Sequence, residues 1–183
     1  MRNSYILVTL ILFVFLTGFR THQDWIIYSS AEGKYSVSYP GTPAEQTQKI
    51  PSVAGELTMY ISILEGGDTD DNIIYMAAYS EYPADKVNSD MSKESLERFF
   101  KGAAEGGARN MNGKVASITE DGYKGFPARL IVSEIKLEDA DFLCLQRIIL
   151  VKNKVYVLQT ITKPDKKSNA NGKKFFDSFG LSE

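Results

Sequence analysis

The stretch Phe142-Leu-Cys-Leu-Gln-Arg-Ile-Ile-Leu-Val151 is almost continuously apolar, interrupted only by Gln146 and Arg147. A run of this kind, bounded by polar turn residues, is typical of a strand that is buried on both faces. We therefore expect a central strand here. Cys144, the one cysteine of the chain, should then be a small buried apolar residue rather than a reactive thiol.

Further strands are predicted on both sides of this central strand. Each is separated from the next by a short polar segment of the kind that closes a hairpin. The strands are residues 114–120, 126–136 and 155–161, and the connecting segments are residues 121–125, 137–141 and 152–154.

The first half of the chain contains shorter strands. Tyr35, Val37 and Tyr39 alternate with serines, which is the period of a half-buried strand. Pro40-Gly-Thr-Pro43 ends this strand, because proline cannot donate to a sheet ladder. A hairpin is expected from residues 57–64 and 72–79, and further strands from residues 25–28 and from residues 46–50 at a sheet edge.

Two amphipathic helices are expected to cover the sheet. The first carries an apolar stripe, begins at Asp90 or Ser92 and ends at Gly106-Gly107. The second begins near Ser168 or Asn169 and ends at Gly180 in a Schellman turn. Their apolar residues are Leu96, Phe99, Phe100, Ala103 and Ala104 in the first, and Phe175, Phe176 and Phe179 in the second. The predicted fold class is α+β: an antiparallel β-sheet flanked by two amphipathic helices.

An apolar leader precedes this domain. Residues 5–16 are apolar apart from Thr9, and Arg2 is the only charged residue before Arg20. This pattern predicts that residues 1–18 are a secretory signal peptide and that the protein is extracytoplasmic. As a helix this run would be about 18 Å long, which is shorter than the ~30 Å hydrocarbon core of a membrane. The alternative is that the leader is not cleaved and stays as an N-terminal membrane anchor. Residues 19–183 then form a single domain.

Five short motifs are spread over this domain. They are Gly33-Lys-Tyr-Ser-Val-Ser-Tyr-Pro40-Gly-Thr-Pro43, Ala54-Gly-Glu-Leu-Thr58, Tyr75-Met-Ala-Ala-Tyr79-Ser-Glu-Tyr-Pro83, Gly125-Phe-Pro-Ala-Arg129 and Phe175-Phe-Asp-Ser-Phe179. Their order resembles that of PsbP-like domains, in particular of exported bacterial members. The resemblance implies a PsbP-like α/β sandwich used for docking, because the photosystem-associated members are extrinsic, non-catalytic subunits. Their metal-binding and partner-binding residues match no motif here, so none is transferred.

The composition argues against many kinds of catalysis. The chain has one histidine, His22, and one cysteine in 183 residues, whereas much acid–base, nucleophilic and transition-metal chemistry uses these residue types. Its formal net charge of −2 gives no electrostatic reason to expect nucleic-acid binding. We assign no catalytic, cofactor-binding or metal-ligating residue, and we expect no cofactor.

The acidic residues and two Ser–Lys neighbours leave an enzymatic alternative. The acidic segment at residues 68–72 lacks the glycine and glutamate of an EF-hand loop, so we interpret it as a solvated hairpin tip. Two acids across a cleft, or a Ser–Lys dyad, would instead indicate a hydrolase of the cell envelope. The residues concerned are Glu134, Asp139 and Asp141 for the acids, and Ser92-Lys93 and Lys167-Ser168 for the dyad.

Two arginines and four tyrosines are candidate binding residues. Arg129 and Arg147 lie on the predicted strands 126–136 and 142–151, which should pair with each other. If the residue numbers of directly opposed residues add up to 276, the two arginines lie opposite each other, and their like charges would require an anion between them. If the numbers add up to 277, the two arginines point to opposite faces of the sheet and form ordinary ion pairs. A tyrosine-rich sheet face could form a binding platform, but half-buried strands favour aromatic residues for packing alone, and core packing is the preferred interpretation. These tyrosines are Tyr60, Tyr75, Tyr79 and Tyr82.

The sequence thus predicts an exported, non-catalytic binding or assembly module of the cell envelope. Its partner is expected to be an envelope protein or a small ligand, with membrane contact only through an uncleaved leader. An exposed aromatic or apolar patch would favour this function. A pocket with convergent acids or a perturbed lysine would favour the hydrolase.

Overall fold

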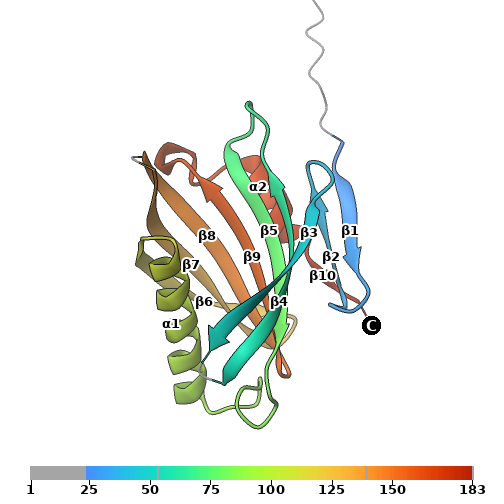
Figure 1. Cartoon of the computed structure of the whole chain (residues 1–183), viewed down its shortest axis with the longest axis vertical. Helices are drawn as coiled ribbons and strands as arrows, with labels where there is room; N and C mark the ends of the chain where they lie inside the picture. Colours follow the sequence, from blue (N-terminus) through green and yellow to red (C-terminus); the bar gives the residue numbers. More distant parts are fainter. Residues whose placement is uncertain (1–23, 53, 139, 183) are drawn as a thin grey trace, which may run out of the picture.

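The computed structural model describes residues 24–52, 54–138 and 140–182. Its largest unit is a seven-stranded antiparallel sheet with the strand order β3-β4-β5-β9-β8-β7-β6 (Figure 1). In chain order the strands are β3 (Ala44–Ser52), β4 (Gly55–Glu65), β5 (Asn72–Glu81), β6 (Lys114–Tyr123), β7 (Phe126–Leu137), β8 (Ala140–Val151) and β9 (Lys154–Thr162).

The two faces of this sheet are covered by different elements. One face packs against a three-stranded antiparallel sheet and helix α2 (Ala170–Asp177), through a core that includes Tyr39, Tyr75 and Phe175. The other face packs against helix α1 (Lys93–Asn110), where Phe100 is fully buried. The small sheet has the order β1-β2-β10, with β1 (Ile26–Ser30), β2 (Tyr35–Tyr39) and β10 (Gly180–Leu181).

The prediction of an α+β fold with one sheet between two helices is wrong. The described chain is mostly β, and its strands form two antiparallel sheets that pack as a β-rich sandwich. The difference arises partly at the C-terminal end, where Gly180 and Leu181 pair with Ser36 and Tyr35 of β2. Gly180 therefore belongs to a strand and does not close a Schellman turn after α2. The strand from residues 35–39 pairs with β1 and β10.

The central position of β8 is confirmed. It lies between β7 and β9, and its residues alternate between the two cores. Ile148 packs under α1, while Ile149 packs against the small sheet and α2. Cys144 is fully buried, as expected, and burial raises the pKa of its thiol to about 12. At neutral pH this cysteine is a protonated apolar residue.

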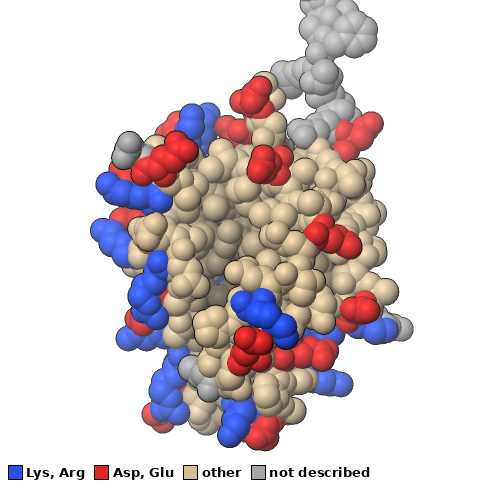
Figure 2. Space-filling view, viewed as in Figure 1, with Lys and Arg blue, Asp and Glu red and all other residues tan. Residues whose placement is uncertain are grey.

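Helix α1 begins as predicted but is longer. The side chain of Ser92 accepts a hydrogen bond from the backbone N–H of Ser95, so Ser92 is the N-cap. The helix continues through Gly106 and Gly107 to Asn110. Gly107 faces the side-chain amide of Gln146, and a Cβ there would make only ordinary contacts, so neither its space nor its backbone requires the helix to end. Lysine and arginine side chains follow the outer side of α1, as its amphipathic sequence requires (Figure 2).

The acidic hairpin between β4 and β5 is a structural anchor rather than only a solvated tip. The Asp70 carboxylate accepts hydrogen bonds from the Tyr75 hydroxyl at 2.7 Å and from the Asn72 backbone N–H at 2.9 Å. The amides of Asn72 and Asn169 donate to each other at 2.8 and 2.9 Å. Asn169 is also the N-cap of α2, as expected. These contacts fix α2 to the hairpin.

The hydroxyl of Tyr39 joins the two sheets. It donates to the carbonyl oxygen of Ser62 at 2.9 Å and accepts from the backbone N–H of Ala77 at 2.9 Å. Ser62 and Ala77 are direct partners in the register of β4 and β5. The hydroxyl of one sheet is therefore inserted between a carbonyl and an amide of the other. All of these groups are buried, so each needs this partner.

We predict that Tyr39→Phe lowers the free energy of unfolding by about 1–3 kcal/mol, because it leaves a buried backbone N–H without a partner. The matched control is Tyr28→Phe, which removes an exposed hydroxyl bonded to Glu45 and should cost about 1 kcal/mol or less. Urea unfolding of both variants measures the difference. Equal losses in the two variants would show that the Tyr39 hydroxyl does not hold the sheets together.

Candidate functional site

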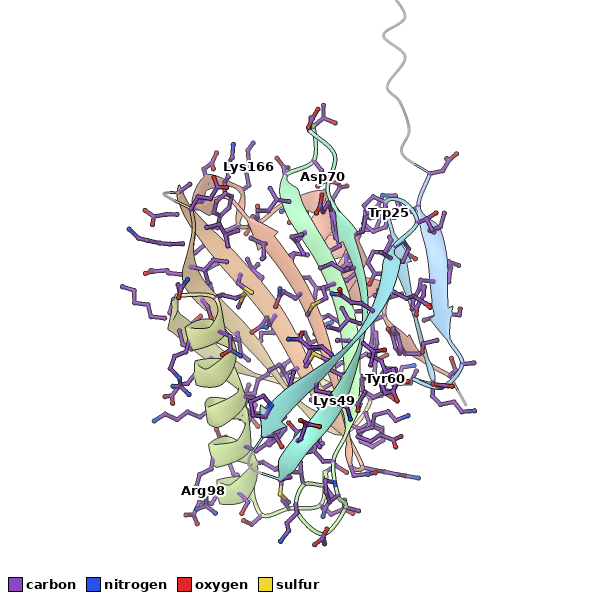
Figure 3. The ribbon with its side chains drawn as sticks, in the orientation of Figure 1. Trp25, Lys49, Tyr60, Asp70, Arg98 and Lys166 are labelled. Atoms are coloured by element: carbon purple, nitrogen blue, oxygen red, sulfur yellow. The ribbon has the colours of Figure 1, made fainter. Side chains whose placement is uncertain are left out.

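A cleft of about 380 Å³ opens between the β1–β2 turn and strands β3 and β4. We call it the tyrosine cleft, because Tyr28, Tyr35, Tyr60 and Tyr79 line it. Tyr28 and Tyr35 come from the small sheet, whereas Tyr60 and Tyr79 come from the large one. Figure 3 shows Tyr60 on the side of β4 that faces the small sheet. The cleft thus forms where the two sheets meet.

The tyrosines differ in their exposure. Tyr35 and Tyr79 are only 2% and 6% exposed and form the floor, with ring centroids 6.2 Å apart. Tyr60 is 39% exposed and stacks on Tyr79 with a centroid distance of 4.8 Å and an interplanar angle of 13°. An exposed ring held by a buried one is pre-oriented, so little side-chain entropy is lost when a ligand covers it.

The rim of the cleft carries two carboxylates. Glu32 lies in the β1–β2 turn and Glu45 lies on β3, and both are exposed. The Tyr28 hydroxyl donates to Glu45 at 2.7 Å and so connects the two sheets at the cleft entrance. Burial, and secondly this hydrogen bond to a carboxylate, raise the pKa of Tyr28 above its ordinary value.

The buried tyrosines of the cleft do not supply an acid–base group at neutral pH. Burial raises the pKa of Tyr79 to about 12 and raises that of Tyr35 as well, so both hydroxyls are neutral at pH 7 and cannot act as bases there. The groups that the cleft offers to a ligand include the face of the Tyr60 ring and the two carboxylates. This combination suits recognition of an organic cation or of a polar surface with hydrogen-bond donors.

The sequence identified only part of this site. Tyr60 and Tyr79 lie in the cleft, whereas Tyr75 is fully buried against Phe175, and Tyr82 packs on Phe99 at the side of α1. The expected platform of four tyrosines therefore does not exist as one surface. The sequence analysis missed Tyr28, Tyr35 and Glu32, because they reach the cleft from a second sheet that was not predicted. It also missed Glu45, which lies on the edge strand β3 of the large sheet.

The two arginines do not form a paired site. In the register of β7 and β8, Leu130 is opposite Arg147 and Arg129 is opposite Ile148, so paired positions sum to 277. The arginines point to opposite faces, and each forms an ion pair, as the alternative predicted: Arg129 with Glu97 at 2.7 Å and Arg147 with Asp121 at 2.9 Å. Arg129 lines a second cleft of about 410 Å³ beside α1, but its guanidinium is already engaged by Glu97 and by the ring of Phe100.

Glu134 and Asp141 of the hydrolase alternative are diagonal neighbours in the register of β7 and β8, but neither lines one of the two clefts. Glu134 pairs with Lys114 at 3.0 Å and Asp141 with Lys136 at 3.7 Å. The Ser92 hydroxyl caps α1, and Lys167 and Ser168 are exposed. Asp139 and His22 lie outside the described residues. Within residues 24–52, 54–138 and 140–182, no three His, Cys, Asp or Glu side chains gather as metal ligands.

The predicted leader, residues 1–18, also lies outside the described part of the chain. Among the helices that are described, none has the length and hydropathy needed to cross a membrane.

The architecture is similar to the solution structure of cyanobacterial PsbP (CyanoP) from Synechocystis sp. PCC 6803. The TM-score is 0.57 and the sequence identity 16%, over 87% of this chain and 93% of that one. The chain therefore has a PsbP-like fold, and at this identity the similarity shows the fold alone. No family model and no curated protein sequence matches the chain.

Two further solved structures show lower similarity. One is PA94 from Pseudomonas aeruginosa, described as a protein of unknown function and putative regulator, with a TM-score of 0.38 and 14% identity over 78% of this chain and 85% of that one. The other is a Bacteroides thetaiotaomicron VPI-5482 protein, with a TM-score of 0.48 and 10% identity over 86% of this chain and 48% of that one.

The buried tyrosines predict a loss of stability at alkaline pH. Burial raises the pKa of Tyr79 and Tyr156 to about 12, and raises that of Tyr39 and Tyr75, whereas an unfolded tyrosine titrates near pH 10. Above about pH 10 the unfolded state therefore binds fewer protons than the native state, and the free energy of unfolding falls as pH rises.

We expect the melting temperature to decline from about pH 10 to pH 12, with tyrosinate absorbance rising as the protein unfolds. Circular dichroism and absorbance at each pH measure the two quantities. Reversible titration of all ten tyrosines near pH 10 in the folded protein would contradict the prediction.

Proposed function

We propose that this chain is an exported, non-catalytic binding or assembly module of the cell envelope. The observation that carries the proposal is the tyrosine cleft, in which the exposed ring of Tyr60 is held by the buried ring of Tyr79. A solvent-facing aromatic residue in a preformed concave site is characteristic of recognition surfaces.

The chemistry of the chain supports binding over catalysis. The one cysteine is buried with a raised pKa, and Glu134 and Asp141 of the hydrolase alternative are each paired with a lysine. The PsbP-like fold agrees with this proposal, because the photosystem-associated members of that family are extrinsic, non-catalytic subunits. Fold alone does not determine function, so the proposal depends on the cleft.

Export is supported by the sequence of the leader. Its apolar run follows a single basic residue and is short for a membrane span. The docking partner is then a protein or small ligand outside the cytoplasm. Membrane attachment would occur only through an uncleaved leader.

The binding function predicts a partner that depends on the cleft. A C-terminally tagged chain, expressed from its full sequence and cross-linked in its own envelope fraction, should retain one stoichiometric partner in high salt. Tyr60→Ala should lose this partner. Ile27→Ala should retain it, because Ile27 is 74% exposed on β1 and does not line the cleft. Recovery of the bare chain from every preparation would contradict a binding or assembly role.

Export predicts a shortened chain. Intact-mass measurement of the native protein should show the loss of residues 1–18, with the protein in the extracytoplasmic fraction. Recovery of the full-length mass from the membrane fraction would instead establish the retained anchor. A full-length chain in the cytosol would disprove export.

A further inference from the structure

The charge of the tyrosine cleft is one-sided. Its lining includes the carboxylates of Glu32 and Glu45, and it includes no lysine or arginine among the described residues. Aromatic ring faces carry partial negative charge, so rings and carboxylates here attract the same kind of group, an organic cation.

The register brings one carboxylate next to the exposed ring. Thr47 is opposite Tyr60, and Glu45 is opposite Ser62, in the pairing of β3 with β4. Glu45 and Tyr60 are therefore diagonal neighbours on one face of the sheet, at a separation that long side chains span. Only one oxygen of Glu45 receives the Tyr28 hydroxyl. A carboxylate has about four acceptor positions on its two oxygens, so Glu45 can accept further bonds.

The same chemistry already operates beside the cleft. The ammonium group of Lys154 lies 5.1 Å from the ring centroid of Tyr79, pairs with Glu81 at 2.9 Å, and donates to the backbone carbonyl of Glu32 at 3.0 Å. An internal cation is thus held by a tyrosine ring, a carboxylate and a carbonyl. Tyr60, which stacks on Tyr79, and Glu45 offer an equivalent ring and carboxylate to a cation from outside.

The cleft also adjoins an unpaired sheet edge. Strand β3 is the first strand of the seven-stranded sheet, and most of its residues are exposed. The outer edge of such a strand offers backbone donors and acceptors to an extended segment of another chain. If such a segment bound along β3, its side chains would lie next to Glu45 and would reach the cleft.

We propose that the tyrosine cleft receives an arginine side chain from an extended segment of a partner protein, with its guanidinium on Tyr60 and bonded to Glu45. Arginine fits this site better than lysine, because its planar group stacks on an aromatic ring while its N–H groups reach a carboxylate. This inference rests on the proposed binding function and names the chemistry of the partner.

The probe for this test is N-acetyl-arginine methylamide, titrated into the isotope-labelled protein in the form recovered after expression of the full sequence. Amide shifts should concentrate around Tyr28, Glu45 and Tyr60, with a dissociation constant on the order of millimolar. N-acetyl-citrulline methylamide is the matched neutral probe, with nearly the same shape and no charge, and should produce no shifts at these residues. Added salt should weaken binding of the arginine probe.

Three variants and one control separate recognition from folding. Tyr60→Ala and Glu45→Gln should each weaken binding of the arginine probe about 2- to 30-fold, whereas Tyr60→Phe keeps the ring face and should bind nearly as well as the native chain. The control is Glu56→Gln, because Glu56 lies on the same hairpin but pairs with Lys49 outside the cleft. Circular dichroism establishes that each variant is folded.

Equal shifts with arginine and citrulline probes, or unchanged binding in Tyr60→Ala and Glu45→Gln, would overturn the arginine proposal. If the cross-linked partner is nevertheless retained by the native chain, the binding function stands and only its chemistry is wrong. If no partner is found and no probe binds, both proposals fail.

Discussion

The hydroxyl of Tyr39 is the interaction on which the sandwich depends. It occupies the position between the Ser62 carbonyl and the Ala77 amide, two groups of neighbouring strands in the large sheet. A buried tyrosine needs a partner for its hydroxyl, and buried backbone groups need one too, so a single insertion satisfies three groups. Because this arrangement works only when β2 lies directly over β4 and β5, it sets the position of the small sheet.

The cleft follows from that position. The Tyr156 hydroxyl donates to the Gly33 carbonyl at 2.7 Å, which fixes the β1–β2 turn over the large sheet. Gly33 itself lies so close to the ring of Tyr35 that a side chain would collide with it. The turn is thus held near β3 and β4, where Tyr28 reaches Glu45. The ring of Tyr60 is left partly uncovered at this border. Its exposure is therefore a consequence of how the two sheets are docked.

Local patterns in the sequence predicted the strands well, and tertiary pairing explains most of the errors. The apolar run at residues 142–151 and the alternation at residues 35–39 have the periods of the strands that form. Gly106 and Gly107 suggested a helix end, but neither adopts the positive φ of a C-terminal cap, and α1 continues to Asn110. Gly180 suggested a helix cap, but its pairing with Ser36 lies far away in sequence. The cleft joins Tyr28 to Glu45 and Tyr35 to Tyr79, and no local pattern reports such contacts.

The same tyrosines are poor acid–base groups at neutral pH. A phenol could act as an acid or base only if its pKa lay near neutrality, but burial moves the pKa of Tyr79 and Tyr156 up to about 12. The hydroxyls of Tyr39 and Tyr156 are already committed to backbone groups that join the two sheets. At the border between the two sheets, the ring face of Tyr60 stays exposed to solvent. A ring face contributes shape and negative charge density without any proton transfer, which suits a chain that has one histidine and one buried cysteine.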